Sequence, residues 1–131
     1  MTKKQKENLK KLLNLKIPKG CKFTMGNYFY NNQVNEVTYN EEITKDSYEC
    51  GTSACFAGYL PYVTGIAKKK SELWQEYIFR VTGLKFGGKN NLAFEYLFDA
   101  EWSNNCLKQA KKRLKEFIDN DFKAPYEFGG F

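Results

Sequence analysis

One stretch constrains the fold more than any other part of the sequence. The run from Thr52 to Leu60 is apolar on almost every side. A helix with apolar residues all round is normally buried at the centre of a fold. We therefore expect a buried, cysteine-bearing helix that ends near Pro61 and opens at the segment Cys50-Gly51-Thr52-Ser53-Ala54-Cys55.

The length and the composition favour one small domain. A chain of 131 residues can bury a core of its own, and 42% hydrophobic with 17% aromatic residues is too apolar for a disordered chain. We predict an α+β, mainly helical fold with four to five helices around the buried helix and a small N-terminal β-hairpin. Within a single domain, 1–131, we expect an amphipathic helix in 1–20, the hairpin in 21–40, a helical core in 50–119 and an aromatic tail in 120–131.

Local patterns predict the individual elements. Thr2 and Gln5 have the spacing of a capping box, and leucines at helical spacing follow them. Alternating residues after the turn at 18–20 predict one strand, and a second strand-like run spans 34–39. The clearest helical pattern belongs to the last helix, where apolar residues recur at three- and four-residue steps: Leu107, Ala110, Leu114, Phe117 and Ile118.

The sequence contains no histidine, which excludes Ser-His and Cys-His nucleophile systems, histidine general bases and most catalytic zinc sites. The four cysteines, Cys21, Cys50, Cys55 and Cys106, form no paired C-x-x-C unit. We therefore predict no metal site, no cofactor and no catalytic residue, and we rank a binding function above an enzymatic one. An enzyme that uses the Cys50 thiol is the remaining catalytic alternative.

The N-terminus is basic, but no apolar stretch follows it that could act as a signal peptide or cross a membrane. We expect a cytoplasmic protein without membrane contact. In that compartment thiols are kept reduced, so we expect the cysteines to be free and buried rather than bridged.

The net charge is +6, and residues 1–22 carry eight lysines against Glu7. This balance favours anionic partners, although lysine-rich solvated helix faces would give the same pattern. Only two of the 21 cations are arginines, which weakens the case for bidentate readout of phosphates or bases.

The predicted helix start is the candidate binding site. Free backbone amides and the helix dipole at Cys50, Gly51, Thr52 and Ser53 would attract an anion and would lower the pKa of a nearby thiol. The alternative is structural: the cysteines are small buried side chains, Thr52 caps the helix, and Ala54, Ala57 and Gly58 allow close packing. For stacking on a ligand we consider Tyr28, Phe29, Trp74 and Trp102.

The segment 50–58 resembles the CGTxACxAG signature of small, uncharacterised proteins of phages, prophages and bacteria. In that group an F-x-M segment stands upstream, as Phe23-Thr24-Met25 does here, and Gly-Leu and Leu-Phe steps stand downstream, as at 83–84 and 97–98. The tryptophan usual after F-x-M is replaced here by Tyr28 or Phe29, and the segment 31–49 is longer. The resemblance implies a phage or mobile-element origin and a location in the host cytoplasm, and it supplies no catalytic residues.

Three functions follow as expectations. The first is a non-enzymatic binder of a small anionic, nucleotide-like ligand that acts against a host defence pathway. The second is a protein-interaction module that inhibits a host enzyme through the acidic segment 31–50 and the aromatic tail. The third is sequence-independent binding of nucleic acid through the lysines of 3–22 and of the last helix.

Overall fold

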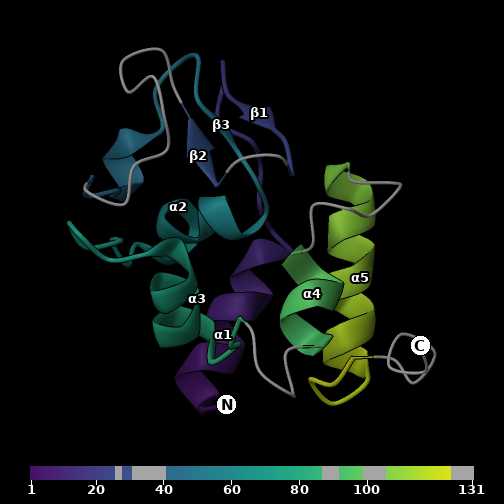
Figure 1. The fold of residues 1–131 in the computed structure, drawn as a ribbon. Coiled ribbons are helices and arrows are strands. Elements are labelled where there is room, and N and C mark those ends of the chain that lie inside the picture. Colours follow the sequence, from purple (N-terminus) through teal and green to yellow (C-terminus); the bar gives the residue numbers. More distant parts are fainter. Residues whose placement is uncertain (26–27, 31–40, 87–91, 99–105, 125–131) are drawn as a thin grey trace.

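The computed structural model describes residues 1–25, 28–30, 41–86, 92–98 and 106–124 (Figure 1). Within them lie five α-helices, two 3-10 helices and three short strands, so the predicted α+β, mainly helical class is confirmed. In chain order the elements are α1 (Lys3–Leu12), β1 (Lys22–Phe23), β2 (Phe29–Tyr30), η1 (Lys45–Ser47), β3 (Ser53–Ala54), η2 (Ala57–Tyr59), α2 (Leu60–Thr64), α3 (Trp74–Thr82), α4 (Leu92–Phe98) and α5 (Leu107–Asp119).

The short helix α2 lies in the middle of the fold, with the sheet at one end and the longer helices at the other (Figure 1). Helix α1 packs against α2, α3 and α5, and α4 packs against α5. The core between them is made of fully buried side chains from all five α-helices and from the segment of η2: Leu9, Leu12, Phe56, Tyr59, Leu60, Tyr77, Ile78, Leu97, Leu114 and Phe117. None of the described helices is long and apolar enough to cross a membrane.

The first helix begins as predicted. The Thr2 hydroxyl accepts a hydrogen bond from the Gln5 N–H at 3.1 Å, and the Gln5 side chain accepts one from the Thr2 N–H at 2.8 Å. This capping box satisfies two of the donors that a helix start leaves unpaired. The helix ends at Leu12, so it covers only the first part of the predicted span 1–20.

The sheet differs from the predicted hairpin. Strand β3 lies between the other two, parallel to β1 and antiparallel to β2, so β1 and β2 do not pair with each other. The middle strand is Ser53–Ala54, which belongs to the segment that we expected to be helical. The predicted second strand at 34–39 lies outside the described residues.

The buried helix is also shorter than predicted. The chain turns at Cys50–Gly51, forms β3, and becomes helical only at η2 and α2. The prediction of burial is confirmed, since every residue from 54 to 61 is buried. The assignment to one helix was wrong because the middle strand of a sheet is covered on both sides, and a short apolar run of this kind has no periodicity that separates strand from helix.

The last helix follows its predicted pattern. Ala110, Leu114 and Phe117 are fully buried on one side of α5. After the helix, the ring of Phe122 packs edge-on against Phe117 at 5.9 Å between centroids. The Lys6 ammonium lies 5.0 Å from the same ring, so this first part of the aromatic tail docks on α1 and α5. Residues 125–131 of the tail lie outside the described residues.

Candidate functional site

The predicted binding residues Cys50–Ser53 do not stand at a helix start. Gly51 adopts φ +94°, and its N–H donates to the Gly20 carbonyl at 2.9 Å. The N–H of Thr52 donates to the Glu49 carbonyl at 3.0 Å, and the Thr52 side chain is fully buried. These amides are therefore already bound within the protein, and the helix end on which the predicted anion site depended is absent here.

The structure assigns packing roles to the next residues of the signature. A Cβ added to Gly58 would lie 1.7 Å from the Tyr28 carbonyl oxygen, because the backbone just before β2 passes directly over this glycine. The Cys55 sulfur accepts a hydrogen bond from the Gly58 N–H at 3.3 Å, and burial raises the pKa of the Cys55 thiol to about 11. Cys55 is thus a buried, protonated packing residue rather than a reactive thiol.

Three of the four predicted stacking residues use their rings within the protein. Tyr28 stacks on Trp74 at 5.5 Å between centroids, with an interplanar angle of 13°. Phe29 packs edge-on against Tyr48 at 5.2 Å and is 2% exposed, while Trp74 is 4% exposed. Phe29 and Trp74 therefore present no open face to a ligand. Trp102 lies outside the described residues.

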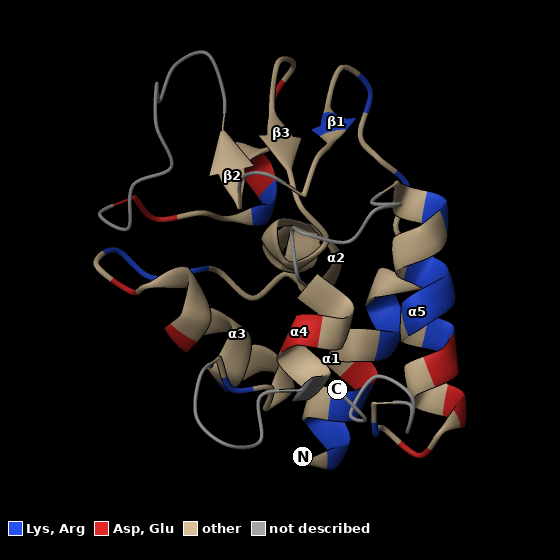
Figure 2. Ribbon diagram, turned by 45° about the vertical axis from the view of Figure 1, so that its right-hand side comes forward, with Lys and Arg blue, Asp and Glu red and all other residues tan. Residues whose placement is uncertain are grey.

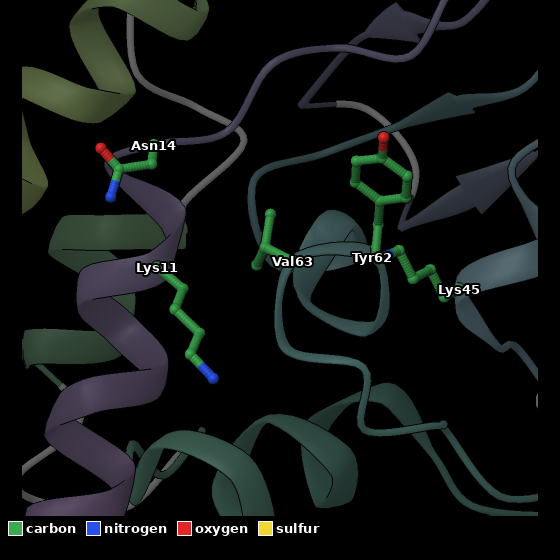
Figure 3. A pocket seen from close by; sticks show the side chains of 5 residues that line it. All are labelled: Lys11, Asn14, Lys45, Tyr62 and Val63. Carbon is green, nitrogen blue, oxygen red and sulfur yellow. The ribbon is translucent and has the colours of Figure 1, made fainter.

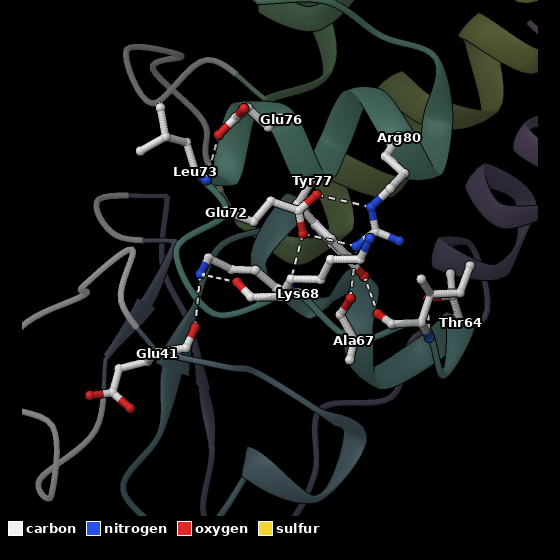
Figure 4. A network of polar contacts seen from close by, with 11 residues as sticks. Glu41, Thr64, Ala67, Lys68, Glu72, Leu73, Glu76, Tyr77 and Arg80 are labelled. Atoms are coloured by element: carbon white, nitrogen blue, oxygen red, sulfur yellow. Dashed lines mark hydrogen bonds and ion pairs between the residues drawn. The ribbon is translucent and has the colours of Figure 1, made fainter.

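A polar network around the buried Lys68 holds the segment that leads into α3 (Figure 4). The Lys68 side chain is fully buried, and its ammonium donates to the Glu41 carbonyl at 2.8 Å and to the Lys69 carbonyl at 3.2 Å. Burial lowers the pKa of Lys68. Arg80 makes two hydrogen bonds of 2.9 Å to the Glu72 carboxylate and a third to the Ala67 carbonyl. The network joins segments of the fold to one another, so we assign it a structural role.

The Glu72 carboxylate gives this network a pH dependence. Burial opposes its charge, but hydrogen bonds from Arg80 and from the Lys69 N–H outweigh burial and hold the pKa of Glu72 below its usual value. A lowered pKa means that the stabilisation is present above the ordinary glutamate pKa and is lost as pH falls through the lower, folded-state value.

We expect Glu72→Gln to lower the free energy of unfolding at pH 7 by about 1 kcal/mol, because the ion pair is partly exposed. The difference from the native protein should shrink toward zero on acidification, which urea titrations between pH 7 and pH 3 would measure. Glu76→Gln is the matched control, because Glu76 also accepts a backbone N–H, that of Leu73, but pairs with no arginine among the described residues. An equal pH dependence in the two variants would contradict this role of Glu72.

A pocket of about 370 Å³ opens elsewhere, between the end of α1, helix α2 and η1 (Figure 3). We call it the basic pocket. Lys11 reaches from α1 toward the space beside α2, and Lys45 reaches from η1 toward the ring of Tyr62 (Figure 3). The pocket is open to solvent, and its lining consists of Lys11, Asn14, Lys45, Tyr62 and Val63.

The charged residues that line the basic pocket are both lysines, Lys11 and Lys45. Within the part of the chain that the structure describes, neither Lys11 nor Lys45 forms an ion pair with a carboxylate. The Lys45 ammonium lies 6.0 Å from the centre of the Tyr62 ring. That ring packs at a tilt against the ring of Tyr48, with 5.4 Å between the ring centroids. The pocket therefore combines two ammonium groups without internal counter-ions, an amide and a half-buried aromatic ring.

No motif in the sequence indicates these lining residues. They come from three segments that are far apart in the chain and carry no motif, and the lysines are two among many.

No protein-family model, curated protein or solved structure matches this chain. Among the described residues, no group of three or more Cys, Asp and Glu side chains is placed to hold a metal ion.

Proposed function

We propose that this protein binds a small anionic, nucleotide-like ligand in the basic pocket without catalysing a reaction on it. The observation that carries the proposal is the approach of Lys11 and Lys45 to one open pocket without a carboxylate partner among the described residues. Ammonium groups form charge-assisted hydrogen bonds with phosphates and carboxylates. The volume of about 370 Å³ lies within the usual range for small-molecule sites.

Tyr62 supports a ligand that carries a ring as well as a charge. Its ring is half-buried, and Lys45 lies over it. An aromatic side chain beside ammonium groups suits a nucleotide, because the base can stack while the phosphates meet the lysines. The resemblance to phage and prophage proteins supports a role against a host defence pathway, in which the protein sequesters a nucleotide-derived signal.

The test is a calorimetric titration with inorganic phosphate, pyrophosphate, ATP and a cyclic dinucleotide. We expect the double variant Lys11→Gln/Lys45→Gln to weaken binding by about tenfold or more, equivalent to roughly 1.4 kcal/mol. Tyr62→Leu should weaken the two nucleotides more than pyrophosphate. The matched control is Lys4→Gln/Lys70→Gln, which removes the same two charges from exposed positions outside the pocket.

Two results would contradict the proposal. One is the absence of binding by every probe at millimolar concentration. The other is an equal loss of affinity in the pocket variant and in the control variant, because that would mean that net charge rather than the pocket attracts the anion.

The packing of α1 against α5 favours a second candidate, which is sequence-independent binding of nucleic acid. The Lys111 ammonium donates to the Leu15 carbonyl at 2.6 Å, so the two lysine-rich segments are neighbours (Figure 2). A parallel titration with duplex DNA distinguishes nucleic-acid binding from binding of a small anionic ligand. Binding that falls steeply with salt, and equally in both double variants, would favour nucleic acid. The host-enzyme alternative relied on segments of which 31–40 and 125–131 lie outside the described residues.

A further inference from the structure

Two glycine turns face each other at one end of the sheet. The Gly51 N–H donates to the Gly20 carbonyl at 2.9 Å, just before the parallel pairing of β1 with β3 begins. Each glycine has a cysteine beside it in the chain, Cys21 after Gly20 and Cys50 before Gly51. The pairing of the two turns therefore brings two thiols from distant parts of the sequence to one place.

Each of the two sulfur atoms lies close to a residue that adjoins the other cysteine in the chain. A Cβ placed on Gly20 would lie 2.7 Å from Sγ of Cys50 and 3.1 Å from its Cβ, so the Cys50 side chain lies against the residue that precedes Cys21. The Cys21 thiol in turn donates to the carbonyl of Glu49 at 3.3 Å. That carbonyl belongs to the peptide that leads into Cys50. Each thiol thus contacts the residue next to the other.

The two thiols differ in their access to solvent. Cys50 is exposed, whereas Cys21 is half-buried. Burial raises the pKa of the Cys21 thiol above its usual value. A reagent from solution therefore meets Cys50 first, and Cys21 is placed to react second. Cys55 is buried, and Cys106 is exposed on α5 at the helix N-cap.

We propose that Cys21 and Cys50 are an oxidation site. A small disulfide oxidant such as glutathione disulfide converts the two thiols into a reversible disulfide between Cys21 and Cys50. The Cys50 thiolate attacks one sulfur of the oxidant, whose S–S bond breaks, and one glutathione leaves as a thiolate. The Cys21 thiolate then attacks Sγ of Cys50 in the mixed disulfide and expels the second glutathione. Two electrons pass from the protein to the oxidant, and the two protons of the protein thiols end on the two glutathiones.

The bond would join the residue before β1 to the turn before β3 and would enclose residues 22–49 in a covalent loop. A cross-link of this kind lowers the conformational entropy of the unfolded chain. The oxidised protein should therefore have a Tm several degrees higher than the reduced protein. This inference is independent of the basic pocket, since none of the residues that line the pocket takes part.

The test treats the reduced, full-length protein with excess glutathione disulfide, blocks the remaining thiols and maps the tryptic peptides by tandem mass spectrometry. We expect the peptide 20–22 linked to the peptide 46–68, with fragment ions that place the bond on Cys50 rather than Cys55. Cys106 should carry a glutathione adduct, which shows that the reagent is active. Reductant should release both.

Two variants show the order of the steps. Cys21→Ser should stop at a stable glutathione adduct on Cys50, because the second thiol is missing, and Cys50→Ser should leave Cys21 reduced. The proposal is overturned if the native protein also stops at an adduct on Cys50. It is equally overturned if the link between the two peptides forms as fast in urea-unfolded protein as in folded protein, because the folded turns would then contribute nothing.

Discussion

Replacing Gly58 with alanine is expected to lower the free energy of unfolding by about 3 kcal/mol, at the upper end of the usual cost of overpacking. The added methyl group would lie 1.7 Å from the Tyr28 carbonyl oxygen and 2.7 Å from its carbonyl carbon, and backbone atoms cannot rotate away as a side chain can. The Gly58 carbonyl also accepts a hydrogen bond from the buried Tyr48 hydroxyl, so any shift of this glycine disturbs a second contact. Urea denaturation measures the loss.

Gly65→Ala is the matched control for Gly58→Ala. Gly65 adopts φ +73° after α2, but no atom lies within 4 Å of an added Cβ. Its cost should be only the backbone strain of a left-handed alanine, about 1 kcal/mol. If Gly58→Ala were no more destabilising than this control, the close approach of the Tyr28 backbone to Gly58 would be wrong.

Tyr59→Ala should destabilise the protein by about 4 kcal/mol, the usual cost of removing a large aromatic side chain from a core. Tyr59 is fully buried in η2 and stacks on Tyr48 at 5.4 Å between centroids. Its hydroxyl donates to the Lys22 carbonyl in β1 at 2.6 Å. The side chain therefore connects the centre of the fold to the outer strand of the sheet. Thermal and urea unfolding would both report the loss.

Tyr59→Phe separates the ring from the hydroxyl. It keeps the packing and removes only the hydrogen bond to Lys22, which should cost about 1 kcal/mol. A phenylalanine variant as unstable as the alanine variant would show that the ring contributes little, which contradicts the burial seen here.

The elements that the sequence predicts best are those whose signals are local. The Thr2–Gln5 capping box lies within one turn of helix, and the apolar steps of α5 repeat along one helix face. Such patterns depend on neighbours three or four residues apart, which the sequence displays directly. Both helices are present in the structure, with α1 shorter than its predicted span.

The prediction of one helix through the signature segment is wrong because pairing with distant strands determines the conformation of this segment. Ser53 and Ala54 are extended because they pair with β1 on one side and β2 on the other. Nothing within 50–60 announces those partners, and apolar residues on all sides suit a central strand as well as a buried helix. The helix start on which the predicted anion site depended is absent, and the backbone amides of Gly51 and Thr52 donate to the carbonyls of Gly20 and Glu49.

The basic pocket had no signal that the sequence could reveal. Its lysines differ from the other lysines of a chain with a net charge of +6 only in where the fold places them. Tyr62 follows Pro61, which we expected near the end of the buried helix, and its place on the pocket depends on α2 lying beside α1 and η1. A site assembled from three segments without a motif becomes visible only in three dimensions.

The most direct test of the proposed function is an NMR titration of the isotope-labelled protein with ATP, in which the shift of each backbone amide is followed. We expect the largest shifts to cluster at Lys11, Asn14, Lys45, Tyr62 and Val63 and to disappear in the double variant Lys11→Gln/Lys45→Gln. Shifts centred on residues 50–53, or spread evenly along the lysines of α5, would contradict it.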